Sequence, residues 1–199
     1  TLGLFAGGRD SNGHGTNVID FVTIASKGDA TEFGNLIEPG GLVAFSHGHV
    51  QKYYRMTGAS STRGIITGGV SPTYDTSIQF ITFATKGDGQ SFGNLSGNHT
   101  GGAGCSNSTR AIFGGGYSTY PANTNIIDFI TIATFGNATD FGNLSAGRRP
   151  RGCSNETRGL FGGGANPMNN IIDFITIQTT GNASDFGDLI TPVQQLGAI

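Results

Sequence analysis

Residues 125–144 read NIIDFITIATFGNATDFGNL, and this stretch decides the fold because the chain repeats it. Residues 170–189 read NIIDFITIQTTGNASDFGDL, and two looser copies begin at residues 17 and 77. The first half of each copy is rich in β-branched and aromatic residues, which favour β-strands. A Gly-Asn or Gly-Asp pair follows in every copy and predicts a two-residue type II′ hairpin turn, in which glycine supplies the positive φ. The four pairs are Gly28-Asp29, Gly87-Asp88, Gly136-Asn137 and Gly181-Asn182.

Two further motifs recur around this stretch. A segment such as RGLFGGG, residues 158–164, precedes each copy and begins at residues 2, 63, 110 and 158. A short segment such as GCSN, residues 152–155, stands before that one. In chain order we expect strands A (GCSN), B (RGLFGGG), C (NIIDFITI) and D (DFGNL). The sequence predicts one domain, 1–199, with units at about 1–61, 62–108, 109–156 and 157–199 and an insertion at about 37–52.

Four short strands repeated about every 47 residues are typical of one blade of a β-propeller. No segment shows a helical period. We therefore expect an all-β, four-bladed β-propeller with four antiparallel strands in each blade. The last residues, 193–199, look like a strand A, so we expect them to pair with residues 2–8 and close the ring. A four-unit piece of a longer propeller is the alternative.

Strand B with its terminal Gly-Gly, followed by a loop and an aromatic strand D, resembles the kelch repeat. Phe33, Phe92, Phe141 and Phe186 stand where kelch units usually carry Trp, and this chain has no Trp. The wording of the four units is also similar to tandem repeats in uncharacterised proteins of marine cyanobacterial viruses. These resemblances imply a kelch-like propeller and a virion structural or tail-associated protein, and they bring no catalytic motif with them.

Composition excludes several classes of partner. Glycine makes up 35 of the 199 residues, while charged residues reach only 12% and the formal net charge is −2. Nucleic acids and anionic membrane surfaces are bound through clustered Lys and Arg, so neither is expected as the main partner. No apolar run approaches the ~20 residues of a membrane span. Two cysteines make no disulfide framework.

The loops differ from unit to unit at only one end of the predicted blades. The A–B and C–D turns are nearly constant, whereas the B–C and D–A loops vary and hold the insertion and all five tyrosines. Variable loops on a rigid scaffold carry recognition, and tyrosine offers a large contact area with a hydroxyl. The alternative is that these loops are merely solvated. We expect the insertion to form a hairpin over its own blade or to dock on a partner, and favour docking. Candidate binding residues are Tyr53, Tyr54, Tyr74, Tyr117, Tyr120, His14, His47, His49, Phe45, Arg148 and Arg149.

Other recurring residues are interpreted as scaffold. Residues that return at one position in several units favour structural ion pairs and hydrogen bonds over catalysis. Those sets are Arg63, Arg110 and Arg158 in strand B, and Asp20, Asp128 and Asp173 in strand C. Two sets of phenylalanines recur, and we expect at least one set to pack between neighbouring blades. The strand C set is Phe21, Phe80, Phe129 and Phe174, and the strand D set is Phe33, Phe92, Phe141 and Phe186. Cys105 and Cys153 are interpreted as small packing residues, with Ala59 and Ala198 as counterparts.

No enzyme signature is present. G-x-S-x-G, H-E-x-x-H, P-loop and CxxC motifs are missing, and no acid or cysteine stands at ligand spacing from His47 and His49. We therefore expect no catalysis, no cofactor and no metal. The predicted function is a non-enzymatic binding or assembly module, a viral tail, fibre or surface protein, located in the virion or outside cells. Its expected partners are other virion proteins or a host-surface glycan, and oligomers are compatible with this role. A secreted or cell-surface lectin or adhesin is the alternative, and a hydrolase is a third interpretation.

Overall fold

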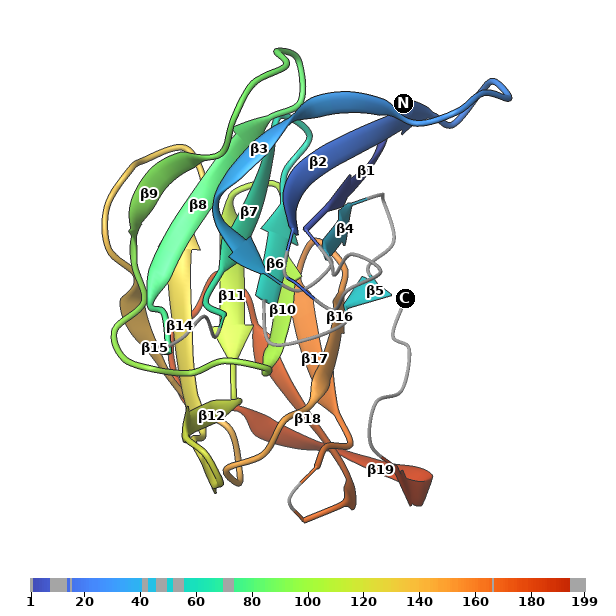
Figure 1. Ribbon diagram of the computed structural model, residues 1–199. Coiled ribbons are helices and arrows are strands. Elements are labelled where there is room, and N and C mark those ends of the chain that lie inside the picture. Colours follow the sequence, from blue (N-terminus) through green and yellow to red (C-terminus); the bar gives the residue numbers. More distant parts are fainter. Residues whose placement is uncertain are drawn as a thin grey trace.

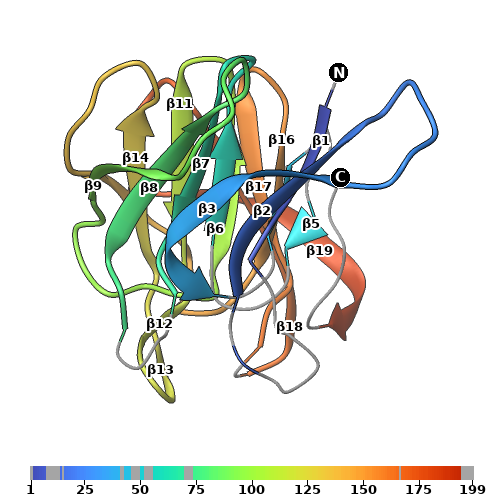
Figure 2. The same cartoon turned by 45° about the horizontal axis from the view of Figure 1, so that its top comes forward.

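The computed structural model describes residues 2–7, 14, 16–40, 43–45, 50–51, 56–69, 74–165 and 167–193. Within these ranges the regular secondary structure consists of β-strands, which pair antiparallel. The all-β class is therefore confirmed. One larger sheet corresponds to each of the four units, and a further sheet has two strands. Figures 1 and 2 show the larger sheets following one another in chain order.

Units two to four each form a four-stranded sheet whose order in space follows the chain, as predicted for strands A to D. The second sheet comprises β6 (Met56–Ala59), β7 (Arg63–Thr67), β8 (Ser77–Thr82) and β9 (Gln90–Asn94). The third comprises β10 (Ala103–Ser106), β11 (Arg110–Gly114), β14 (Ile126–Thr131) and β15 (Thr139–Asn143). The fourth comprises β16 (Arg151–Ser154), β17 (Arg158–Gly162), β18 (Asn169–Thr176) and β19 (Ser184–Val193). A separate two-stranded sheet, β12 (Tyr117–Thr119) and β13 (Ala122–Asn123), lies in the B–C loop of the third unit.

The first sheet departs from the prediction at the side of its first strand. Its strands B, C and D are β1 (Leu2–Ala6), β2 (Thr16–Thr23) and β3 (Thr31–Gly40). The neighbour of β1 is β4 (Val43–Phe45), which pairs in turn with β5 (Val50–Gln51). The sequence predicts residues 193–199 in this place, and that assignment is wrong because the insertion, which follows β3 directly, supplies a strand through a much shorter connection. Residues 194–199 lie outside the described part of the chain.

The insertion at 37–52 therefore follows the hairpin alternative in its described part. Strands β4 and β5 extend the first sheet beyond β1. The preference for docking of this segment on a partner is not needed to explain why the chain carries it.

The Gly-Asp and Gly-Asn pairs do not form the predicted two-residue turns. Strand C of the second unit ends in an earlier turn, where the Thr85 N–H donates to the Thr82 carbonyl at 3.3 Å, and β9 begins only at Gln90. Gly87 has a φ of 151°, far from the value of about +60° that a type II′ turn requires. Its N–H donates instead to the carbonyl of Phe33 at 3.0 Å, so the pair serves the contact between units.

The innermost strands are the three strands A, and β10 contacts both β6 and β16 (Figure 1). Gly58 stands opposite Ile65 in β7, the same place that Cys105 takes opposite Ile112 in β11. The counterpart of the cysteines is therefore Gly58, and the predicted equivalence with Ala59 is wrong by one residue. Burial of Cys105 is consistent with a packing role. Ala198 lies outside the described residues.

Two serines join the strands A side by side. The Ser106 hydroxyl donates to the Ala59 carbonyl at 3.0 Å, and the Ser154 hydroxyl donates to the Ser106 carbonyl at 2.8 Å. The same hydroxyls accept from backbone N–H groups, at 3.0 Å from Ala59 and at 3.1 Å from Ser106. Neighbouring inner strands are thereby held together by pairs of hydrogen bonds that a simple apolar contact does not provide.

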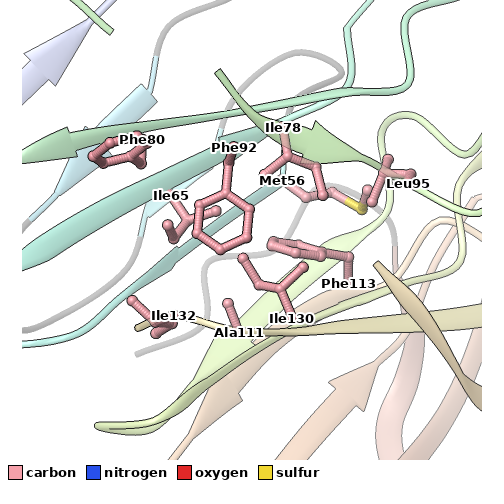
Figure 3. Close-up of a cluster of buried hydrophobic side chains, with 10 residues drawn as sticks. All are labelled: Met56, Ile65, Ile78, Phe80, Phe92, Leu95, Ala111, Phe113, Ile130 and Ile132. Carbon is pink, nitrogen blue, oxygen red and sulfur yellow. The ribbon is translucent and has the colours of Figure 1, made fainter. Parts of the chain in front are cut away.

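The core lies between consecutive sheets, in three clusters. Between the second and third sheets, Phe92 packs with Phe113 and Ile130 (Figure 3). Phe33 and Phe141 occupy the same position in the other two clusters. The prediction that strand D phenylalanines pack between units is thus confirmed for Phe33, Phe92 and Phe141, whereas Phe186 is 51% exposed. In each unit the strand C ring meets the strand D ring edge to face, at 6.3, 6.2, 5.9 and 6.0 Å between centroids.

The strand B arginines also connect units. The Arg63 guanidinium donates to the Ile132 carbonyl at 2.7 Å, and Arg110 donates to the Ile177 carbonyl at 3.0 Å. Each guanidinium also lies over the strand C phenylalanine of its own unit, as Arg158 lies over Phe174 at 5.1 Å. The structural interpretation of this set is confirmed by these bonds.

Candidate functional site at the variable loops

Two tyrosines bring separate units together at the variable loops. Tyr74 belongs to the B–C loop of the second unit and Tyr120 to that of the third. The phenol oxygen of Tyr74 accepts a hydrogen bond from the backbone N–H of Tyr120 at 2.6 Å. A bond of this kind positions one variable loop on the other, which the sequence could suggest only as a shared end of the blades.

A small hairpin presents the Tyr120 ring to solvent. Strands β12 and β13 flank the turn that carries Tyr120, whose side chain is 69% exposed. Tyr117 at the base of the hairpin is buried and meets the Tyr120 ring edge to face at 5.4 Å. Backbone bonds between Tyr117 and Thr100, at 2.7 and 3.1 Å, tie the hairpin to the D–A loop of the preceding unit. The Tyr117 ring is thus held inside the protein, and the Tyr120 ring is exposed to solvent.

Arg149 completes the surface from the next D–A loop. Its guanidinium lies 4.5 Å from the centroid of the Tyr117 ring, within range of a cation–π contact. Its Nε is buried without a hydrogen-bond partner. Burial and the charge of Arg149 lower the pKa of the nearby Arg151 guanidinium. Positive charge therefore gathers beside the two tyrosine rings.

We refer to Tyr74, Tyr117, Tyr120 and Arg149 as the tyrosine–arginine surface. It offers an exposed aromatic face, a phenol and a guanidinium, which bind by stacking, hydrogen bonding and charge. Such groups are typical of recognition surfaces. All four residues are among the predicted candidates, and the structure brings them together.

Arg148 is the candidate that the structure contradicts. Its side chain is fully buried, and its guanidinium pairs with the Asp173 carboxylate at 2.7 Å. The same guanidinium donates to the carbonyls of Gly163 at 3.0 Å and Phe161 at 2.9 Å. A surface-binding role is therefore wrong for Arg148, because its donors are already used inside the protein. A clue was the recurrence of Asp173 in strand C, which needs a partner when buried.

The preceding unit uses a histidine at the same place. His99 Nε2 lies 2.9 Å from the Asp128 carboxylate, and both side chains are fully buried. Burial alone would raise the pKa of Asp128, but hydrogen bonds from His99 and Ser96 outweigh it and keep this pKa below its usual value. His99 thus anchors its D–A loop from inside the protein.

The remaining candidates do not join this surface in the described structure. His14 is exposed in the B–C loop of the first unit. Tyr53, Tyr54, His47 and His49 lie outside the described residues, and Phe45 is described only as a backbone position in β4. Among the residues that the structure describes, no group of three or more His, Cys, Asp or Glu side chains is arranged to hold a metal ion.

No protein-family model matches this chain, and no curated protein matches it. In the described ranges the structure contains no helix long and apolar enough to cross a membrane.

Proposed function

We propose that the protein is a non-enzymatic binding and assembly module that recognises its partner through the tyrosine–arginine surface. The hydrogen bond from Tyr120 to Tyr74 carries this proposal. It fixes two variable loops of different units relative to each other, while one ring remains 69% exposed. Rigid aromatic side chains lose little conformational entropy when they bind, which suits them to recognition.

The proposed setting is a viral particle, in which the protein serves as a tail, fibre or surface component. Support comes from the similarity of the four units to tandem repeats of cyanobacterial viruses. Partners would then be neighbouring virion proteins, contacted by the variable loops.

For the fold we propose a kelch-like, four-bladed propeller. The support is the A-to-D strand order of units two to four and the placement of the four sheets around one centre (Figure 2). In the first blade, β4 stands in the place of strand A.

The alternative function is glycan binding by a secreted or cell-surface lectin or adhesin. An exposed Tyr120 ring next to a guanidinium favours it, because aromatic faces stack on sugar rings and Arg149 offers charge and hydrogen bonds to acidic groups. This alternative uses the same surface and differs in the partner.

Site-specific photocross-linking tests the proposal in the native particle. A photoreactive phenylalanine analogue replaces Tyr120, and the control carries it at Thr180, an exposed C–D turn residue at the opposite end of its sheet. We expect a cross-link to another particle protein from position 120 only. A purified protein that instead binds sugars on a glycan array, and loses them in Tyr120→Ala, supports the lectin. Equal cross-linking at both positions, or no partner and no sugar, contradicts recognition by this surface.

A further inference from the structure

The contact between consecutive units is repeated three times with the same atoms. Between the second and third units, the N–H groups of Gly136 and Ala138 donate to the carbonyls of Phe92 and Asn94, at 3.0 and 2.8 Å. The side chain of Asn137 accepts from the Asn94 N–H at 3.0 Å. The same three bonds join unit one to unit two and unit three to unit four, through Gly87, Asp88 and Gly89 and through Gly181, Asn182 and Ala183.

Glycine allows this close approach. A Cβ added to Gly34, Gly93 or Gly142 in strand D would collide with the carbonyl of the glycine in the next unit. At Gly187, the equivalent residue of the last unit, an added Cβ would meet nothing within 4 Å. Strand β19 therefore carries the glycine that allows this contact, but only β3, β9 and β15 make the contact.

Other residues of β19 are exposed in the same way. Phe186 is 51% exposed, whereas its equivalents Phe33, Phe92 and Phe141 are at most 4% exposed. Ile190 is fully exposed. The last sheet thus presents one half of the interface between units, and none of the described residues forms a sheet against it.

The first sheet presents the other half. Phe5 in β1 is 44% exposed, although its equivalents Ile66, Phe113 and Phe161 are fully buried against the preceding unit. Ile24 is 55% exposed, whereas its equivalents Ile132 and Ile177 are at most 3% exposed. In each inner interface, the residues equivalent to Phe5 enter the cluster that contains the strand D phenylalanine of the unit before.

We propose that the last sheet packs against the first sheet of the same chain through a fourth copy of this interface, which closes a ring of four sheets. Figure 1 shows the first sheet at the upper right and β18 and β19 of the last sheet at the lower right. Because the two complementary faces belong to one chain, their packing needs no second copy. This inference rests on the proposed propeller, and it is independent of what the tyrosine–arginine surface binds.

The repeat specifies the bonds of the closed ring. The N–H groups of Gly28 and Ala30 donate to the carbonyls of Phe186 and Asp188. The Ile190 N–H donates to the carboxylate of Asp20, as Ser96 and Ser145 donate to Asp128 and Asp173 at 2.7 and 3.0 Å. Arg158 donates to the carbonyl of Ile24, in the same way as Arg63 and Arg110 each donate to a carbonyl of the unit that follows their own.

One residue departs from the pattern and makes this interface weaker than the others. Asp188 stands where Asn35, Asn94 and Asn143 stand in the earlier units. Closure brings its carboxylate beside that of Asp29, and like charges repel. We expect Asp188→Asn to strengthen closure and to raise the melting temperature. A matched control, Asn143→Asp with Asn182→Asp, places the same repulsion in an inner interface and should lower it.

Cross-linking tests the closure directly. Cysteines replace Asp29 and Asp188 in a chain whose own Cys105 and Cys153 are changed to alanine, and a short bismaleimide is added. The control pair, Asn94→Cys with Asn137→Cys, lies in an inner interface of the structure.

We expect both pairs to give a cross-linked monomer that has lost both thiols, at a yield that does not depend on protein concentration. Cross-linked dimers that increase with concentration would assign the faces to a second copy and overturn the ring. Reaction of the control pair alone would also overturn it. Photocross-linking from position 120 is unaffected by either outcome, so failure of the ring and failure of the proposed function are distinguished.

Discussion

Replacement of Arg148 by alanine separates the role that the structure gives this residue from the one that the sequence suggests. The guanidinium is fully buried, pairs with Asp173 at 2.7 Å and satisfies the carbonyls of Gly163 and Phe161. Removal of one partner of a buried ion pair costs about 3–5 kcal/mol, because the other charge stays buried without compensation. For a chain of this size, this corresponds to a fall of roughly 6–20 °C in melting temperature.

Urea denaturation of Arg148→Ala, followed by circular dichroism, measures this loss. Arg149→Ala is the matched control, because Arg149 is the next residue in the sequence but stacks on Tyr117 and has no such ion pair in the described structure. The loss of stability in Arg149→Ala should stay below about 1 kcal/mol. A second variant, Asp173→Asn, removes the charge from the other side and should be less stable than the native chain. Equal stability of Arg148→Ala and Arg149→Ala would refute the anchoring role.

Three further predictions follow from burial. Phe92→Ala should destabilise the protein by about 3–5 kcal/mol in urea, because it empties the cluster between the second and third sheets. The pKa of Asp128 is lowered in the folded protein, so its contribution to stability is present above the unfolded pKa and is lost as the pH falls below that value. In urea titrations between pH 7 and about pH 3, the stability of Asp128→Asn should therefore fall less than that of the native chain. Burial and the neighbouring Cys153 raise the pKa of the Cys105 thiol, so a thiol reagent at pH 8 should modify Cys105 only after unfolding.

The strands of the fold are predictable from the sequence because their signal is repeated. Period-2 segments such as residues 125–132 return in every unit, and each becomes strand C of a sheet. The register of strand A is not predictable in this way, since GCSN is short and carries no apolar alternation. The partner of β1 is not predictable for a different reason: the insertion changes which strand is near, and a repeat pattern says nothing about residues that occur only once.

Polar residues show the same limit at the candidate site. Tyr74 and Tyr120 are predicted binding residues because exposed loops of a rigid scaffold tend to carry recognition. The structure brings the two residues into contact, and their part in recognition stays a prediction. Arg148 and Arg149 are neighbours of one residue type, and no feature of the sequence pattern distinguishes them. Successive side chains of an extended chain point in opposite directions. The Arg148 side chain therefore enters the protein, whereas the Arg149 side chain lies on Tyr117.

The buried pairs explain how loops that differ in sequence from unit to unit keep a fixed position. His99 is buried against Asp128, and the next residue, Thr100, pairs with Tyr117. Arg148 is buried against Asp173, and the next residue, Arg149, covers the ring of the same Tyr117. In both D–A loops an internal pair fixes one residue, so the following residue contacts Tyr117 at a defined point. Because the anchor is a carboxylate of the next unit's strand C, the loop end is positioned by the sheet that packs against it. We therefore expect His99→Ala to weaken binding through displacement of Thr100 and Tyr117, although His99 itself is not exposed.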